Sequence, residues 1–235
     1  MTAAADGALV AEIRAGLAEV GDPAIAVPMQ AYMKSAMPYF GVQTAARRQV
    51  CRRVFDAHPL DGFGRWQATV LVLWRQAGHR EERYCAIDLA GDRRYAVHQD
   101  VRTLPIYEEL VVTGAWWDLV DPVATHRLGT LLERDPARID PIMRAWARDR
   151  DLWKRRSAIL CQVRSKAATD LSLLYDCIAP NLGERSFWIR KAIGWALRDY
   201  GRTDPAEVAR YVDYLGDALS PLSRREALKH VPGRA

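Results

Sequence analysis

The chain has 235 residues, 49% of which are hydrophobic, and it carries a formal net charge of +5. This length suits one large domain or two small ones, and the sequence shows neither a secretion signal nor the roughly 18 uninterrupted apolar residues of a membrane helix, so we expect a soluble protein. The four cysteines and five histidines are scattered without a CxxC pair, which argues against a disulfide framework, a bound metal or a metal cofactor.

The basic excess lies entirely in the second half of the chain. Residues 1–120 carry 13 basic and 14 acidic groups, whereas residues 121–235 carry 21 and 15. Such asymmetry suits a polyanionic partner, because each phosphate neutralised by Arg or Lys releases condensed counterions. However, 29 of the 34 basic residues are Arg, so a compositional bias of the source explains the charge equally well. Charge alone therefore leaves both interpretations open.

The pattern of apolar residues predicts helices throughout. Apolar positions recur at spacings of three and four residues, and alternating β-branched runs are nearly absent. We expect Thr44 to be the N-cap of a helix over residues 45–57, with Pro59 just beyond its end. A second clear helix is predicted over residues 187–200, where Gly201 follows as a natural stop.

Five Asp-Pro steps divide the chain into short segments. They begin at Asp22, Asp121, Asp135, Asp140 and Asp204. Asp at the N-cap followed by Pro at the first helical position is a common helix opening. We expect about a dozen helices, with two recurring about every 36 to 40 residues, which predicts an α-solenoid of helical hairpins. No linker interrupts the pattern, so we expect a single domain over residues 1–235.

The first candidate site is the Trp-Trp-Asp-Leu-Val-Asp-Pro run at residues 116–122. If this segment is helical, Trp117 and Asp121 lie on the same face because they are four residues apart. The simpler interpretation is that the tryptophans belong to the core and that Asp121 is an N-cap, as expected for the other Asp-Pro steps. From the spacing alone, the N-cap is the favoured role.

A second candidate site is the basic triplet Lys154-Arg155-Arg156, which opens an apolar helix after Trp153. Three cations near a helix N-terminus oppose the helix dipole and therefore favour an anionic partner, for which phosphate is the obvious candidate. The alternative is a solvated helix start with no partner.

A third candidate lies in the predicted helix over residues 187–200. Trp188, Lys191 and Trp195 fall close to one angular position, away from the apolar stripe that contains Ile193. The result is an aromatic and basic face, which either meets a partner or packs on the neighbouring repeat.

The separations between these candidates match the predicted repeat. Arg156 follows Asp121 by 35 residues, and Trp195 follows Arg156 by 39. Residues one repeat apart occupy equivalent places on a solenoid. We therefore expect a carboxylate, a cation and two indoles to converge on one concave surface.

Four parts of the chain carry specific motifs. They are Gln-Ala-Tyr-Met-Lys with Gly-Val-Gln-Thr (30–34 and 41–44), Trp-Trp-Asp-Leu-Val-Asp (116–121), Arg-Arg-Ser-Ala-Ile-Leu (155–160), and Phe-Trp-Ile-Arg-Lys-Ala-Ile-Gly-Trp with Leu-Arg (187–195 and 197–198). In these parts, which span the chain from about residue 25 to residue 230, the sequence resembles the AlkD-type alkylpurine DNA glycosylases of bacteria. The resemblance implies an all-α superhelix of HEAT-like repeats with a concave basic cleft.

The resemblance also implies the active site. The family's catalytic Trp, Asp, Arg and Trp fall on Trp117, Asp121, Arg156 and Trp195. Asp121 would stabilise the developing sugar cation and the attacking water, the two indoles would offer π-faces to a cationic nucleoside, and Arg156 would hold the backbone phosphate beside the lesion. Pro122 departs from the family pattern, and a proline at this position alters the helical pitch at Asp121.

Further residues are expected at the DNA. Tyr32 and Gln43 match family positions near bound DNA. The others are Lys154 and Arg155 of the basic triplet, Lys191 of the aromatic and basic face, and its neighbour Arg190. The other departures from the family are extra tryptophans at Trp116, Trp153 and Trp188.

The implied function is that of a monofunctional DNA glycosylase of base excision repair. It would release N3- or N7-alkylated purines from double-stranded DNA, as a monomer in the cytoplasm at the nucleoid and without a cofactor. A cationic purine leaves as a neutral base, so it needs no general acid and one carboxylate suffices.

Two other functions compete with this one. A related solenoid would bind damaged or branched DNA without catalysis, although binding alone has no need of Asp121 near phosphates. A protein-interaction scaffold is the commonest use of such repeats, and the basic second half argues against it.

Overall fold

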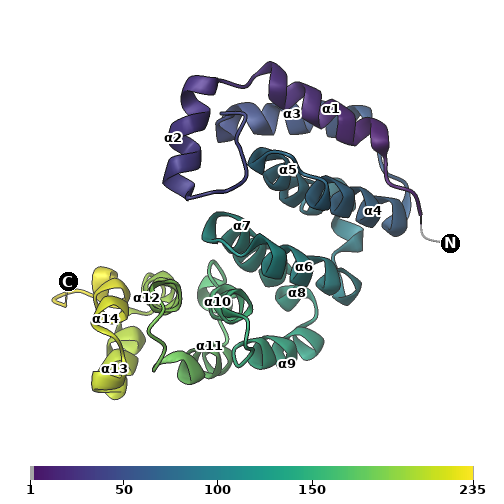
Figure 1. Ribbon diagram of the computed structural model, residues 1–235. Helices are drawn as coiled ribbons and strands as arrows, with labels where there is room; N and C mark the ends of the chain where they lie inside the picture. The colour runs from purple at the N-terminus through teal and green to yellow at the C-terminus, as the bar shows by residue number, and fades with distance from the viewer. Residues whose placement is uncertain (1–2, 235) are drawn as a thin grey trace. The chain divides into compact units, whose positions relative to one another are not determined.

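The computed structural model describes residues 3–234, and their regular structure is entirely helical (Figure 1). This confirms the all-α prediction, since no strand occurs among the described residues. The chain divides into two compact units, with the division after His98. The solenoid arrangement, the basic cleft and the single domain over residues 1–235 stay predictions.

The first unit contains five α-helices and a short 3₁₀ turn. They are α1 (Gly7–Glu19), α2 (Pro23–Met33), α3 (Thr44–Ala57), α4 (Gly62–Arg75), α5 (Arg80–Ala90) and the turn at Arg93–His98. Helix α4 packs on α5, and α1 packs on α3. Trp66 and Trp74 of α4 are fully buried in this core. Helix α2, in contrast, has no buried residue.

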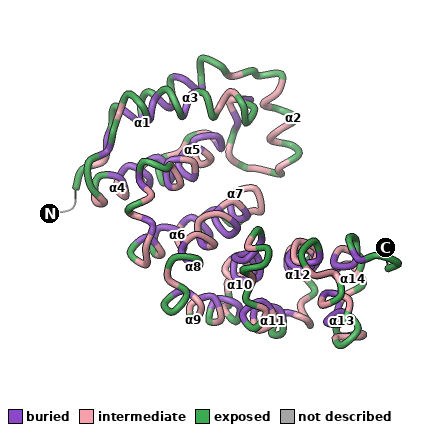
Figure 2. Tube along the Cα trace, turned by 180° about the vertical axis from the view of Figure 1, so that it is seen from behind, coloured by how far each residue is buried: buried purple, intermediate pink, exposed green. Residues whose placement is uncertain are grey.

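The described part of the second unit contains nine α-helices, a π-helical turn and five short 3₁₀ turns. The α-helices and the π-turn are α6 (Leu104–Gly114), α7 (Trp117–Pro122), the π-turn (Val123–Leu128), α8 (Gly129–Arg134), α9 (Pro136–Trp146), α10 (Leu152–Leu160), α11 (Leu171–Ile178), α12 (Phe187–Tyr200), α13 (Pro205–Leu215) and α14 (Pro221–Ala227). Helix α10 packs against α6, α7, α9, α11 and α12, and Figure 2 shows how much of it is buried. The helix that carries Arg156 is thus central to this unit.

Helix α12 has the bounds that the sequence predicts. It runs from Phe187 to Tyr200, the Ser186 hydroxyl accepts a hydrogen bond from Trp188 N, and Gly201 is the C-cap residue. Both ends of the helix are determined by residues next to them in the sequence, so the predicted and observed bounds agree.

The predicted N-cap of α3 is wrong by one residue. The cap is Gln43, and Thr44 is already helical. The buried carboxylate of Glu81 fixes the preceding backbone, because it accepts hydrogen bonds from the N–H groups of Gly41 and Val42 at 2.9 and 3.0 Å. The backbone that leads into α3 is therefore held by a residue 39 and 40 positions further along the chain.

The Asp-Pro steps divide into two groups. Asp22, Asp135 and Asp204 are N-caps whose side chains accept backbone hydrogen bonds, as predicted. Asp121 and Asp140 instead lie inside α7 and α9, so the expectation that every such step opens a helix is wrong. Both carboxylates have an arginine partner in place of the backbone amides.

Candidate active site

Asp121 and Arg156 form a buried, two-pronged ion pair. Arg156 Nε donates to Asp121 Oδ1 at 2.7 Å, and Arg156 Nη2 donates to Asp121 Oδ2 at 2.7 Å. The two residues are only 9% and 4% exposed. The favoured N-cap role of Asp121 is therefore wrong, because both of its oxygens face a guanidinium from α10. This fork geometry gives strong, directional hydrogen bonds.

Burial and the arginine act in opposite directions on the Asp121 carboxyl. Burial raises its pKa, while the hydrogen bonds and the positive charge of Arg156 lower it, and Asp118 raises it further. Burial is the largest effect, so the pKa lies above the ordinary value of an aspartate. The negative charge of Asp121 thus depends on the neighbouring guanidinium.

The third nitrogen of the Arg156 guanidinium contacts α12. Arg156 Nη1 donates to the backbone oxygen of Trp188 at 2.5 Å. The guanidinium carbon also lies 5.9 Å from the centre of the Trp188 ring, a distance at which a cation is attracted to the ring face. One side chain of α10 therefore joins the predicted carboxylate on α7 to the aromatic face of α12.

A π-turn begins two residues after Asp121. Pro122 has no N–H to donate to the carbonyl of Asp118, and its ring crowds that carbonyl, so the regular helical ladder ends here. The next six residues form the π-turn, and the helix then continues as α8. Thr125 Oγ1 donates to the Asp121 backbone oxygen at 2.9 Å. Such π-turns are frequent at functional sites.

A close helix contact sets the position of this broken helix. A Cβ atom on Gly129, the first residue of α8, would lie 2.9 Å from the backbone oxygen of Cys161 at the end of α10. Only glycine allows so close an approach. The segment that carries Asp121 is therefore held against the helix that carries Arg156.

The two predicted tryptophans lie on the same helices. Trp117 is the first residue of α7, one turn before Asp121, so the two share a face as predicted. Trp195 lies on α12, seven residues after Trp188 and on the same side, about 10 Å further along the helix. Both indoles are partly exposed, as a face that meets a ligand requires.

Three other tryptophans pack together beside Arg156, and we call Trp116, Trp153 and Trp188 the tryptophan cluster. The ring centroids are 5.0 Å apart for Trp116 and Trp188, 5.9 Å for Trp153 and Trp188, and 6.2 Å for Trp116 and Trp153. The sequence placed Trp116 and Trp188 in separate candidate sites and Trp153 just before another, but it did not predict that the three rings contact one another. In the sequence, each of them lies within seven residues of a predicted catalytic residue, and this proximity could have indicated that they belong to the site.

The predicted DNA-binding cations all have partners within the protein. Lys154 Nζ lies 2.6 Å from Asp149 Oδ2 and 2.8 Å from Glu108 Oε1. The remaining contacts are Arg155 Nη2 to Glu184 Oε2 at 2.6 Å, Arg190 Nε to the Glu184 backbone oxygen at 3.0 Å, and Lys191 Nζ to Glu226 Oε1 at 3.0 Å. A phosphate at these positions would have to compete with these oxygens.

The other two predicted DNA contacts belong to the first unit. Tyr32 on α2 is 75% exposed, and Gln43 is exposed at the N-cap of α3. Both side chains are therefore accessible to a partner.

The family of the chain follows from comparison with known proteins. A family model described as "DNA alkylation repair enzyme" matches residues 13–231. The chain belongs to this family. A solved structure titled "Predicted DNA alkylation repair enzyme from Enterococcus faecalis" is 28% identical, with a TM-score of 0.80, and the match covers 91% of this chain and 97% of that one. No curated protein gives a significant match.

These findings confirm the resemblance to AlkD-type proteins. The family model covers all four predicted catalytic residues and all six predicted DNA contacts, since the first of them is Tyr32 and the last is Trp195. The catalytic and DNA-binding roles of those ten residues stay predictions.

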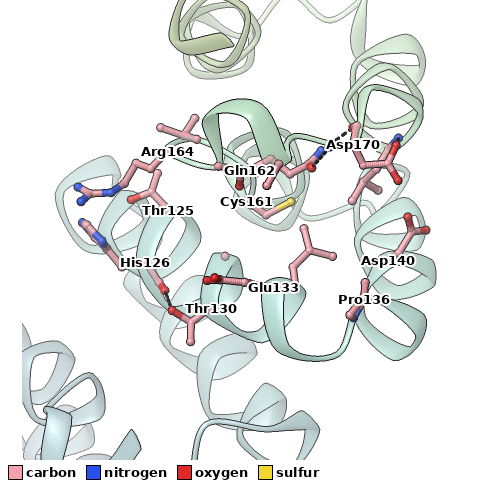
Figure 3. Close-up of a pocket in the computed structure, with 16 residues that line it drawn as sticks. Thr125, His126, Thr130, Glu133, Pro136, Asp140, Cys161, Gln162, Arg164 and Asp170 are labelled. Carbon is pink, nitrogen blue, oxygen red and sulfur yellow. Dashed lines mark hydrogen bonds between the residues drawn. The ribbon is translucent and has the colours of Figure 1, made fainter. Parts of the chain in front are cut away.

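This DNA alkylation repair protein also has a pocket of about 470 Å³ in its second unit (Figure 3). It lies where the π-turn and α8 meet the end of α10, and its lining includes His126, Glu133, Arg164 and Asp170. None of the four predicted catalytic residues lines it. The pocket therefore does not serve as a base-holding chamber for Asp121.

The cysteines and acidic groups of this repair protein form no metal centre in the part described. No group of three or more His, Cys, Asp or Glu within residues 3–234 has an arrangement that holds a metal ion. The cysteines are Cys51, Cys85, Cys161 and Cys177, and all four are free and buried. None of the described helices is long and apolar enough to cross a membrane.

Proposed function

We propose that the protein is a monofunctional DNA glycosylase that releases cationic N3- or N7-alkylated purines, methylated or bulkier, from duplex DNA. The observation that carries the proposal is the pairing of a buried carboxylate, Asp121, with Arg156, flanked by the partly exposed Trp117 on the same helical face. Membership of a DNA alkylation repair family supports it. We expect the protein to act alone in the cytoplasm and without a cofactor.

The chemistry needs one carboxylate. Water adds to the anomeric carbon of the deoxyribose, the bond to the purine nitrogen breaks, and the base leaves neutral because it began with a positive charge. The Asp121 carboxylate stabilises the positive charge that develops on the sugar. Burial, which raises the pKa of Asp121, also makes its carboxylate a better acceptor for the proton that the water loses.

Arg156 prepares Asp121 for this role. By pairing with both carboxylate oxygens it opposes the effect of burial and favours the charged form. When DNA binds, a backbone phosphate competes for the same guanidinium, because phosphate also accepts paired hydrogen bonds from arginine. The phosphate and Asp121 would then share the guanidinium, and the remaining lone pair on each carboxylate oxygen accepts a hydrogen bond from the attacking water.

The aromatic residues explain the preference for cationic lesions. Trp117 and Trp195 offer electron-rich faces that attract a positively charged nucleoside, each by about 0.5 to 2 kcal/mol. A neutral base such as uracil gains little from these faces and is a poorer leaving group without an acid to protonate it.

The test is incubation of the purified protein with a duplex that contains N7-methylguanine, followed by detection of the free base. We expect release from this duplex and none from a matched uracil duplex. A Trp195→Ala variant should lose more activity on the cationic lesion than on an isosteric neutral one. Release of uracil at a comparable rate would contradict the proposed selectivity.

A second candidate function is binding of damaged or branched DNA without catalysis. It is favoured by the fact that both oxygens of Asp121 are already bonded to Arg156, as in a purely structural ion pair. This function predicts preferential binding of damaged duplex with no free base released. The same incubation, combined with a binding measurement, separates the two candidates.

A further inference from the structure

The tryptophan cluster draws one residue from each helix that carries a proposed catalytic residue. Trp116 is the N-cap residue of α7. Trp153 lies three residues before Arg156 on α10, and Trp188 lies seven residues before Trp195 on α12. The three helices therefore meet through aromatic contacts immediately beside the proposed active site.

Trp188 makes the direct connection to Arg156. Its backbone oxygen accepts the hydrogen bond from Nη1, and its ring lies beside the guanidinium. The other two nitrogens donate to Asp121. The guanidinium is thus held on one side by the carboxylate and on the other by Trp188, and Trp188 is in turn held by Trp116 and Trp153.

We propose that Trp188 is a positioning residue, which, braced by Trp116 and Trp153, fixes the guanidinium of Arg156 against the carboxylate of Asp121. This inference rests on the proposed glycosylase function of that site. A forked hydrogen bond requires both nitrogens to be in place, so a change of rotamer at Arg156 breaks two bonds at once. Displacements of about 1 Å at a catalytic group can lower a rate about a hundredfold.

Core packing alone does not account for the cluster. Core tryptophans of this protein, such as Trp66 and Trp74, are 0% and 1% exposed. Trp116 and Trp188 are partly exposed instead. In addition, Trp116 Nε1 is shielded from solvent without a hydrogen-bond partner in the described structure, which a residue selected only for stability would avoid. Trp153 is buried like a core residue, whereas the partial exposure of Trp188 accompanies a ring that lies beside Arg156.

The first experiment measures the position of Arg156 without relying on activity. In ¹⁵N NMR spectra, a guanidinium Nε–H bonded to a carboxylate exchanges slowly with water, and loss of the signal in Arg156→Lys assigns it. We expect the signal to persist in Trp188→Phe, which keeps an aromatic ring, and to disappear in Trp188→Leu. The control is Tyr211→Leu, which removes a buried ring stacked on Tyr175 in the same unit and should leave the signal intact.

The second experiment measures release of N7-methylguanine. We expect Trp188→Leu to lower kcat about tenfold or more with KM changed less than about twofold, and Trp188→Phe to recover most of the rate. In an Arg156→Lys background, the Trp188→Leu change should cost less than about twofold, because a residue that acts through Arg156 has nothing left to position.

The outcomes separate this inference from the proposed function. If the wild-type protein shows the protected Nε–H signal but releases no base, the proposed function fails while the positioning of Arg156 by Trp188 is still tested by the NMR comparison. If Trp188→Leu retains the signal and the wild-type rate, the inference is wrong. Equal losses in Trp188→Leu and Tyr211→Leu would also overturn it, because both would then reflect general destabilisation.

Discussion

Asp121 is subject to two opposing influences at one carboxyl group, burial and the charge of Arg156. In a buried pair, removal of one partner leaves an uncompensated group in a poorly solvated place, which commonly costs about 3 to 5 kcal/mol. Loss of either partner is therefore expected to lower the stability of the fold, whatever it does to activity. For a substitution at either residue, both activity and stability must be measured, because a loss of activity can result from a loss of stability.

The Asp121→Asn substitution keeps the size of the side chain and removes its charge. We expect base release to fall about a hundredfold or more, because a charge that stabilises the transition state is lost. Binding to duplex should be unchanged or slightly tighter, because a carboxylate that repels phosphate is gone. Release and binding are measured on the same N7-methylguanine duplex. Parallel loss of both would indicate that Asp121 has only a structural role.

The pH dependence of stability should reveal the raised pKa of Asp121. Because the folded-state pKa lies above the ordinary value, this group stabilises the fold at pH values below its unfolded pKa, and that contribution is lost as the pH rises through the folded pKa. Urea unfolding of the wild-type protein and of Asp121→Asn, from about pH 4 to pH 7, checks this. The stability of the wild type relative to the variant should decrease with pH, and an increase would contradict the assignment.

Among the helices, the one that the π-turn interrupts determines where Asp121 lies. Pro122 ends α7 one residue after Asp121, and the chain resumes as α8 at Gly129. Before the π-turn, Asp121 is bonded to Arg156 of α10, and after it, Gly129 closely approaches the end of α10. The interrupted helix is therefore held against α10 on both sides of the π-turn. The position of Asp121 therefore depends on packing several residues away from the carboxylate itself.

A Gly129→Ala substitution tests this anchoring. The new methyl group would lie 2.9 Å from a backbone oxygen, so α8 and α10 must separate, at a cost of about 1 to 3 kcal/mol. We expect lower stability in urea and slower base release. The matched control is Gly183→Ala in the same unit, where a Cβ atom has no neighbour within 4 Å. If both variants behave like the wild type, the contact does not position the site.

For the molecule as a whole, the distribution of charge predicts how it binds DNA. The excess of basic residues lies beyond residue 120, and three of the predicted phosphate contacts there, Lys154, Arg155 and Lys191, are paired with acidic groups in the free protein. Binding then exchanges internal ion pairs for phosphate contacts and releases counterions from the DNA. The affinity should accordingly fall steeply as salt is added.

Lys191→Ala should make this salt dependence shallower. Loss of one phosphate contact lowers the slope of log K against log salt by about one unit. Arg138→Ala is the comparison, since Arg138 is an exposed cation of the same unit that pairs with Asp135 and is not among the predicted contacts. Fluorescence anisotropy with labelled duplex gives both slopes. An unchanged slope for Lys191→Ala would place this residue outside the DNA interface.

The sequence correctly predicted those structural features that depend only on residues close to one another in the chain. The bounds of α12 follow from its own start and stop, and the capping roles of Asp22, Asp135 and Asp204 follow from the Asp-Pro step. The partner of Asp121 lies 35 residues away, so no local pattern distinguishes its side chain from a cap.

Other features escaped prediction for related reasons. The Glu81 carboxylate that fixes the start of α3 belongs to another helix, α5. A π-turn lengthens each hydrogen-bonded turn by one residue, and the spacing of apolar residues is too coarse to show so small a change. The tryptophan cluster combines residues from three helices, and only the folded structure shows that they meet.

The four buried cysteines have a consequence for a protein that works where alkylating agents are present. Such electrophiles attack thiolates rather than thiols. Burial raises the pKa of Cys177 to about 12 and holds those of Cys85 and Cys161 well above the ordinary value, so these three remain protonated as well as inaccessible. The agents that create the proposed substrate therefore meet these three thiols in their buried, protonated form, which is the unreactive one.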